Sequence, residues 1–242
     1  MANKMYSHIG LICVQIILCL DWSTSQDFSS FGILFSSCQR FTPQFDDCIK
    51  DAINSARPFF TTGVPEYNIP PFDPWYADEV NQVRSGYKLK LKHVKESGWQ
   101  QSTITKFRAN LEAGYIKFSQ FFPEKYLEGE YITEAGGTTK GVWNMTLYNY
   151  SQTMTIRKSK TDPYKVNVKV NIDKIGNLNI HVSNLLRGRK RVESVLDVLI
   201  NSTWRMGFPL LKPLIEDLVA TAFSKIYSNI FGNYNWDILF PF

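Results

Sequence analysis

A segment near the C-terminus has apolar residues over most of the circumference of a helix. Its main stripe recurs at steps of three and four residues: Phe208, Leu211, Ile215, Leu218, Ala222, Ile226 and Ile230. Other apolar residues widen the stripe and leave a narrow polar strip: Lys212, Glu216, Asp217, Ser224 and Ser228. A helix that is apolar on most sides has to be buried on most sides. Other structure must therefore surround it, and Pro209 and Pro213 predict a bend in it.

The period of the apolar residues changes to two between about Tyr87 and Leu186. Apolar and polar side chains alternate over residues 164–173, which predicts a half-buried strand. Gly176 and Asn177 predict a turn and, with it, a hairpin. Strands this close in sequence predict an antiparallel sheet with one apolar face. The fold class is therefore α+β, with a strongly curved antiparallel sheet wrapped around a long C-terminal helix.

Of two cysteines, Cys38 lies before an amphipathic helix predicted over residues 45–56, and Cys48 lies within it. An even pair in a secreted chain favours a disulfide, which closes a short loop. A zinc site is the alternative, but structural zinc needs four ligands. The prolines in residues 64–74 predict an extended segment after the helix.

Residues 1–25 have the features of a secretory signal peptide, with Lys4 before an apolar run from Ile9 to Leu20. The run is shorter than the ~20 residues of a membrane-spanning helix, although an uncleaved anchor stays open as an alternative. We therefore expect a secreted, extracellular monomer with one domain at residues 26–242. Three sequons are candidates for glycosylation, which suits secretion: Asn144, Asn149 and Asn201.

The composition excludes few partners and supports no catalysis. The formal net charge of +5 is spread along the chain, so it does not indicate a nucleic-acid partner. The sequence contains no hydrolase elbow, zinc-protease or phosphate-loop motif, and we expect neither a metal nor a cofactor. A secreted hydrolase would need His93 as its base, and remains the weakest alternative.

Aromatic residues make up 14% of the chain, which allows either a solid core or an apolar cavity for a small molecule. Six residues are candidates for ligand contact: His93, Tyr131, Trp143, Trp204, Phe208 and Leu211. His93 continues an apolar strand face, unless a bulge leaves it in solvent. Tyr131 offers a phenol that could bind an ester, epoxide or carbonyl. All but His93 are equally compatible with ordinary core positions.

Six stretches carry a resemblance to a known family, in the order in which that family has them. They are CQRFTPQFDDC at 38–48, GVPEYNIPPFDP at 63–74, YLEGEYI at 126–132, LLRG at 185–188, NSTW at 201–204 and WDILFP at 236–241. The chain thereby resembles the insect takeout and haemolymph juvenile-hormone-binding proteins over nearly all of residues 26–242. Tyr131 occupies an aromatic position of the family.

The resemblance implies a hydrophobic tunnel for a terpenoid, a fatty acid or a similar lipophilic ligand, in a protein that is not an enzyme. It also implies roles linked to feeding, circadian rhythm or juvenile-hormone signalling. The chain departs from the family in a more polar segment at 135–141 and a more basic one at 187–191. It also lacks the additional disulfide of the juvenile-hormone binders, which places it nearer the takeout branch.

The basic segment 187–191 supports a second reading of the function. A lipid-surface-binding defence protein of the lipopolysaccharide-binding type would use such positive charge, as would weak contact with a membrane surface or receptor. The same residues also suit a solvated connector before the long helix, or a processing site for a convertase.

Overall fold

The computed structural model describes residues 30–67, 69–84, 86–134, 137–162, 165–186 and 190–232. The predicted signal peptide and residues 187–189 of the basic segment lie outside this part of the chain. Short helices come first: α2 (Ser30–Ser36), α3 (Phe45–Ser55), α4 (Phe59–Thr62) and the 3-10 turn η1 (Pro65–Tyr67). The strands are β1 (Trp75–Arg84), β2 (Tyr87–Ser97), β3 (Thr103–Asn110), β4 (Tyr115–Glu134), β5 (Thr138–Lys158), β6 (Val166–Lys174) and β7 (Asn177–Val182). Helix α5 (Lys190–Gly232) follows.

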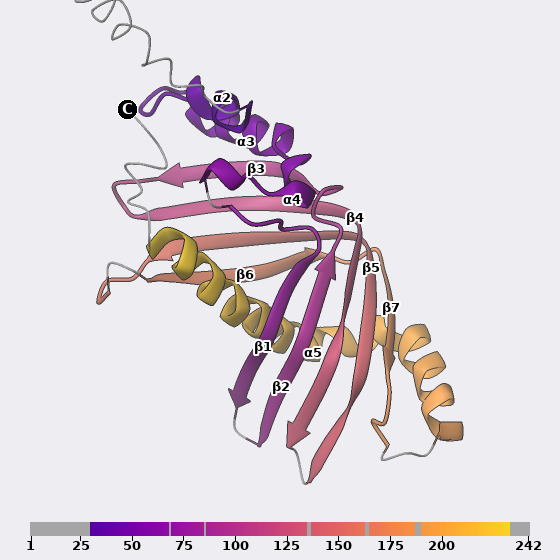
Figure 1. The fold of residues 1–242 in the computed structure, drawn as a ribbon. Coiled ribbons are helices and arrows are strands. Elements are labelled where there is room, and N and C mark those ends of the chain that lie inside the picture. Colours follow the sequence, from indigo (N-terminus) through magenta and orange to yellow (C-terminus); the bar gives the residue numbers. More distant parts are fainter. Residues whose placement is uncertain are drawn as a thin grey trace, which may run out of the picture.

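The strands form one antiparallel sheet that curves around α5 (Figure 1). Its order is β1-β2-β4-β5-β6, with β3 added to β4 and β7 added to β5. The two longest strands, β4 and β5, pair along nearly their whole length. One half of this long hairpin is flanked by β3 and β6, and the other half by β2 and β7. The predicted fold class is confirmed.

The long hairpin bends at Pro123 of β4, which lies opposite Asn149 of β5. The pairing omits these two residues, and Asn149 has a positive φ of 48°. On β4 the inward positions are even before the bend, as at Phe122, and odd after it, as at Lys125. On β5 the inward positions are odd before the bend, as at Leu147, and even after it, from Tyr150 onward. The bend therefore adds one residue to each strand and exchanges its inner and outer faces.

A bulge in β2 corrects the predicted position of His93. His93 has a positive φ of 48°, and the pairing with β4 shifts between Lys92 and Lys95. The extra residue turns the imidazole outward, where 71% of the side chain is exposed. It also turns Val94 and Glu96 inward, so that the strand face after Leu91 is not the one that strict alternation predicts.

The hairpin predicted at Gly176 and Asn177 is wrong. Both β6 and β7 pair with β5, one after the other along its length, and not with each other. The chain at Gly176 bends without reversing, because β5 itself bends at the adjacent Asn149. A Cβ atom on Gly176 would lie 2.8 Å from that of Asn149 and 2.9 Å from the Tyr148 carbonyl oxygen, which leaves room only for glycine.

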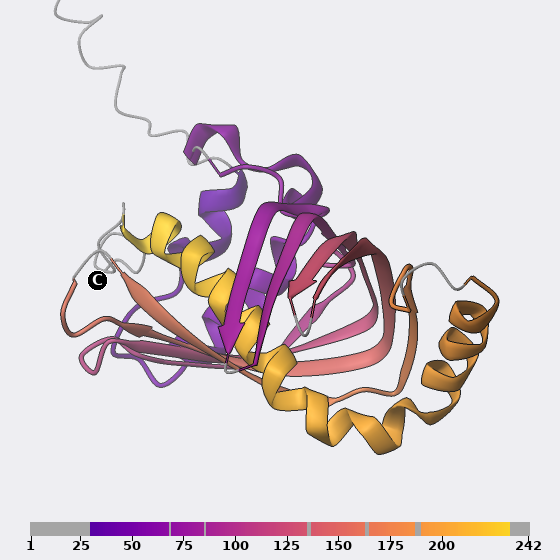
Figure 2. The ribbon, with the colours of Figure 1, turned by 90° about the horizontal axis from the view of Figure 1, so that it is seen from below.

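Helix α5 crosses the open side of the sheet and curves along its course, as its internal prolines, Pro209 and Pro213, predict (Figure 2). Its polar strip fastens two sheet edges. The backbone N–H groups of β6 donate to side chains of α5, namely Ile172 to Glu216, Val168 to Ser224 and Val166 to Ser228. On the other edge, Gln82 of β1 donates to Asp217 at 2.8 Å. These bonds satisfy part of the free edge of β6 and hold the helix inside the curve.

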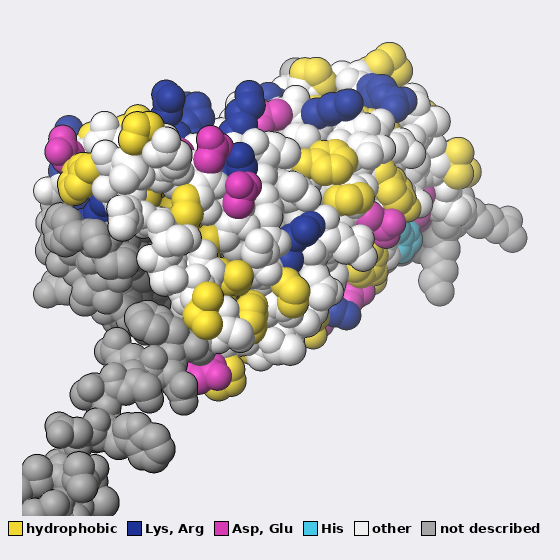
Figure 3. Space-filling view, turned by 90° about the horizontal axis from the view of Figure 1, so that it is seen from above, with side chains coloured by type: hydrophobic (Ala, Val, Ile, Leu, Met, Phe, Trp, Pro, Cys, Tyr) yellow, Lys and Arg dark blue, Asp and Glu magenta, His cyan; other side chains and the backbone are white. Residues whose placement is uncertain are grey.

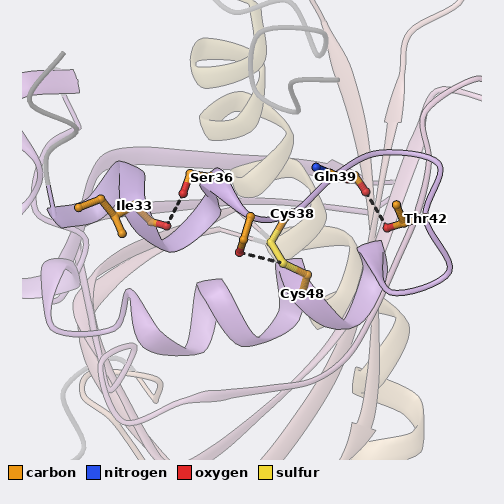
Figure 4. Close-up of a disulfide and its surroundings, with 7 residues drawn as sticks. Ile33, Ser36, Cys38, Gln39, Thr42 and Cys48 are labelled. Atoms are coloured by element: carbon orange, nitrogen blue, oxygen red, sulfur yellow. Dashed lines mark hydrogen bonds between the residues drawn. A yellow bond between two sulfur atoms is a disulfide. The ribbon is translucent and has the colours of Figure 1, made fainter. Parts of the chain in front are cut away.

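The N-terminal helices form a small layer on β3. The Cys38–Cys48 disulfide links the residues after α2 to α3, as predicted, with a Cα–Cα distance of 5.4 Å (Figure 4). Asn54 of α3 exchanges two hydrogen bonds with the backbone of Ile104 in β3. In the segment predicted to be extended, η1 is helical, Val64 and Ile69 form an isolated antiparallel bridge, and residues 70–74 contain no helix. This layer covers one end of the sheet.

Candidate functional site

An apolar cavity of about 340 Å³ lies between the inner face of the sheet and α5. Volumes of roughly 300–1,000 Å³ are typical of small-molecule sites. The sheet contributes aliphatic side chains and one methionine: Leu127, Met145, Leu147, Ile172, Leu178 and Ile180. The helix contributes Ile200, Trp204, Met206, Phe208, Ile215 and Val219. The alternation over residues 164–173 includes Ile172, and the helical stripe includes Phe208 and Ile215.

Two of the predicted contact residues line this cavity. Trp204 is 9% exposed, and its ring meets the edge of Phe208 with ring centroids 5.9 Å apart. Leu211 belongs to the same helix, but its side chain lies outside the described residues. The helix thus supplies two large rings to one wall of the cavity.

Tyr131 and Trp143 lie in a separate cluster with Val80, Leu91 and Val94. The Tyr131 hydroxyl donates to the carbonyl oxygen of Ser183 at 2.8 Å, so it is already engaged within the protein. Burial, with a smaller contribution from the charge of Glu193, raises the pKa of this phenol. Neither ring lines the cavity, and His93 lies outside with its Nδ1 atom 3.2 Å from Glu130.

The polar part of the cavity wall is an ion pair that the sequence analysis missed. Lys125 and Glu96 are 4% and 5% exposed, and their Nζ and Oε1 atoms lie 2.5 Å apart. The ammonium group lies over three aromatic rings, 4.4–5.4 Å from their centroids: Trp99, Phe122 and Tyr150. Strict alternation from Leu91 and Phe122 places both charged residues outside. Pro123 within β4 is a signal of this change of face, because a proline inside a strand marks an edge or a bulge.

The other polar side chains of the wall are engaged elsewhere. Tyr150 donates its hydroxyl to Gln152, and Thr203 donates to the carbonyl oxygen of Leu199 in its own helix. Burial raises the pKa of the Tyr150 phenol far above its ordinary value, so it stays protonated. Lys125 and Glu96 are therefore the charged groups that this wall presents to the cavity.

A second apolar chamber of about 350 Å³ lies under the N-terminal helices, with walls that include Phe31, Phe72 and Trp99. The two chambers share no wall residue. Between them lie Phe122 and Phe223, which are 0% and 1% exposed, and Trp99 contacts both. These rings form an aromatic partition between the two chambers.

The three sequons differ in the access to their amides. Asn149 is exposed at the bend of β5, whereas Asn144 is half-buried within that strand. The Asn201 amide accepts a hydrogen bond from the Ile180 N–H at 2.8 Å and donates to the Ile180 carbonyl at 2.9 Å. The Asn201 side chain therefore contributes to the contact between α5 and β7.

The charged surface forms no single patch on the face shown in Figure 3, where lysine and arginine side chains lie in several groups among acidic and apolar ones. Within the described ranges, no three His, Cys, Asp or Glu side chains are arranged to hold a metal ion. The helices in that part of the chain include none with the length and apolarity needed to cross a membrane.

The fold is a long helix held in a curved antiparallel sheet, with an apolar cavity between them. The profile of the haemolymph juvenile hormone binding protein (JHBP) family matches residues 13–241, so the chain belongs to that family. A search of curated proteins finds no match.

Among solved structures, the crystal structure of Takeout 1 from Epiphyas postvittana is similar with a TM-score of 0.56. The two sequences are 20% identical, and the match covers 76% of this chain and 90% of that one. A lipopolysaccharide binding protein aligns with a TM-score of 0.31 and 9% identity, over 78% of this chain and 39% of the other. The Takeout 1 match supports the fold alone.

Proposed function

We propose that this protein is a secreted, extracellular carrier that encloses a small lipophilic ligand, such as a terpenoid or fatty acyl compound, without chemical change. The apolar cavity between α5 and the sheet carries the proposal, because its walls offer a ligand almost only apolar surface. Membership of the JHBP family agrees with this function. The carrier acts as a monomer without a cofactor, and residues 1–25 are removed on secretion.

Two measurements test the proposal. Organic extraction of the purified protein followed by mass spectrometry should give one hydrophobic compound in stoichiometric amount. A fluorescent naphthylamine probe should bind the emptied protein and be displaced by terpenoids or fatty acyl compounds. A protein that is empty after purification and binds no probe would contradict the carrier function.

Two neighbouring positions on β7 provide a matched pair of variants. Ile180→Trp puts a large ring into the cavity and should weaken probe binding at least tenfold, because the space is taken. Asn179→Trp adds the same ring at an exposed position of the same strand and should leave binding unchanged. Equal affinities of the two variants would place the ligand elsewhere.

A second candidate function, weak contact with an anionic lipid surface, is favoured by the N-terminal part of α5. This part exposes apolar side chains, which are 48–76% accessible: Val192, Val195, Val198, Leu199 and Met206. It follows the basic segment 187–191 in the sequence. Apolar residues beside basic ones are the pattern of a helix that lies on a membrane.

Sedimentation with anionic and neutral liposomes tests this second function. Anionic liposomes should carry down the wild-type protein, and Val195→Asp with Val198→Asp should abolish sedimentation. Val83→Asp alters an equally exposed valine on β1 and serves as the control. Sedimentation that is unaffected by the two α5 substitutions would exclude this surface.

A further inference from the structure

The ion pair of Lys125 and Glu96 lies in the wall of the apolar cavity. Binding of a purely apolar molecule does not require charged groups there. Burying two charges costs several kcal/mol per ion, and apolar residues of similar size often replace such a pair without loss of stability. Three aromatic faces compensate part of the cost for Lys125 by cation–π attraction. The pair closes the inner end of the cavity, next to the aromatic partition.

Both members of the pair retain capacity for a further hydrogen bond. A carboxylate accepts at several lone pairs, and an ammonium group donates three protons. The Oε1 atom of Glu96 lies 2.5 Å from the Lys125 ammonium group, so the ion pair engages this oxygen through one of its two lone pairs and leaves the other for a second donor. Both residues belong to the cavity wall, so a polar group at this end of a bound ligand would lie next to the pair.

The net charge of the pair indicates which head group of a ligand it can bind. The pair is neutral as a whole, and a third charge in this apolar space would have no partner. A carboxylate head would leave one uncompensated negative charge, whereas a quaternary ammonium head would leave a positive one. A neutral hydroxyl can accept a hydrogen bond from Lys125 and donate one to Glu96 without changing the net charge.

We infer that Lys125 and Glu96 recognise a neutral hydroxyl head group at the inner end of a lipophilic ligand, so that the ligand class is an aliphatic or terpenoid alcohol. This inference rests on the proposed carrier function and deepens it. The aliphatic wall of the cavity takes the hydrocarbon body, and the ion pair orients the molecule with its hydroxyl against the partition. The partition then limits how long the body can be.

Displacement of the naphthylamine probe by three ligands of matched chain length tests the inference: a primary alcohol, the alkane with the same number of non-hydrogen atoms, and the fatty acid as its carboxylate at pH 8. The wild-type protein should bind the alcohol roughly tenfold more tightly than the alkane or the carboxylate, a factor that corresponds to about 1.4 kcal/mol. No preference for the alcohol in the wild-type protein would overturn the inference without any variant.

A double variant locates the preference at the ion pair. Lys125→Met with Glu96→Leu removes both charges together, since removing one alone would leave the other buried and unpaired. The preference for the alcohol should fall to about one, while alkane binding persists. The control is Lys95→Met with Glu128→Leu, which removes the neighbouring pair of the same two strands on the outer face, where the side chains are 39% and 40% exposed.

The outcomes separate this inference from the carrier function. Alkane binding without a preference for alcohol leaves a carrier and overturns the head-group assignment. An alcohol preference that survives in the Lys125/Glu96 double variant also overturns it. Failure of every ligand and of the probe to bind removes the carrier function and the inference together.

Discussion

The two parts of helix α5 meet the sheet in different ways. In the second part, residues 208–232, none of the described large apolar side chains is exposed, and Phe223 lies in the aromatic partition. In the first part, residues 190–207, several apolar side chains face solvent, and Trp204 is the buried residue among those described. Asn201 binds the Ile180 backbone, and Asp197 binds His181 and the Val182 N–H of β7.

The difference indicates which part of the helix can move. Apolar burial holds the second part in the core, whereas the first part is held by Trp204 and by hydrogen bonds to β7. Ile200, Trp204 and Met206 of the first part line the cavity, so its release from β7 would open that wall. Segments with few buried apolar contacts open at the lowest free energy. We therefore expect the ligand to enter at the first part.

The largest expected effect is on Phe223. Phe223→Ala leaves a void at the centre of the molecule and should lower the free energy of unfolding by about 3–5 kcal/mol, measured by urea denaturation. Val198→Ala in the first part, where the side chain is 70% exposed, should change it by less than about 0.5 kcal/mol. Similar losses of unfolding free energy in the two variants would contradict the proposed difference between the two parts of α5.

A substitution of Asn201 tests the contact between the first part of α5 and β7. Asn201→Ala removes both hydrogen bonds to Ile180 and should destabilise the contact with β7 by about 1–3 kcal/mol, because two backbone groups lose their partners. Hydrogen exchange should rise in residues 190–207 but not in residues 208–232. The neighbouring Ser202→Ala, which loses only a bond within the helix, is the control.

Ser224 tests whether the polar strip contributes to the second part. Ser224→Ala leaves the Val168 N–H without its acceptor and should cost about 1 kcal/mol in the free energy of unfolding. Thr221→Ala removes a hydroxyl that bonds only to Asp217 of its own helix and should cost less. Equal costs would show that the bond to the edge of β6 adds nothing.

The smallest expected effect on stability is that of Met206, which is 76% exposed. Met206→Gln should leave the unfolding midpoint in urea unchanged, because little apolar area is buried there. If the first part of α5 admits the ligand, the same substitution in the cavity wall should alter the rate of probe uptake. Stopped-flow fluorescence measures the rate, and a changed midpoint would show that Met206 is packed in solution.

Periodicity predicted the elements well because it records which residues avoid water. The alternation in residues 166–174 returns as the strictly alternating burial of β6, and the apolar stripe returns as α5. The stripe includes Phe208 and Ile215, which line the cavity. Periodicity could not place Glu96 and Lys125, because an added residue at His93 or at Pro123 leaves the amino-acid pattern unchanged while it turns every later side chain over.

By itself, the sequence determined the Cys38–Cys48 pair, the helical and strand periods, and the need to enclose an apolar helix. Only the tertiary structure decided which strand faces line the interior, since the bulge in β2 and the bend of the long hairpin depend on pairing between strands. It also decided that β6 and β7 follow β5 one after the other. The physical reason is that periodicity is local, whereas the register of a curved sheet is set by partners distant in the chain.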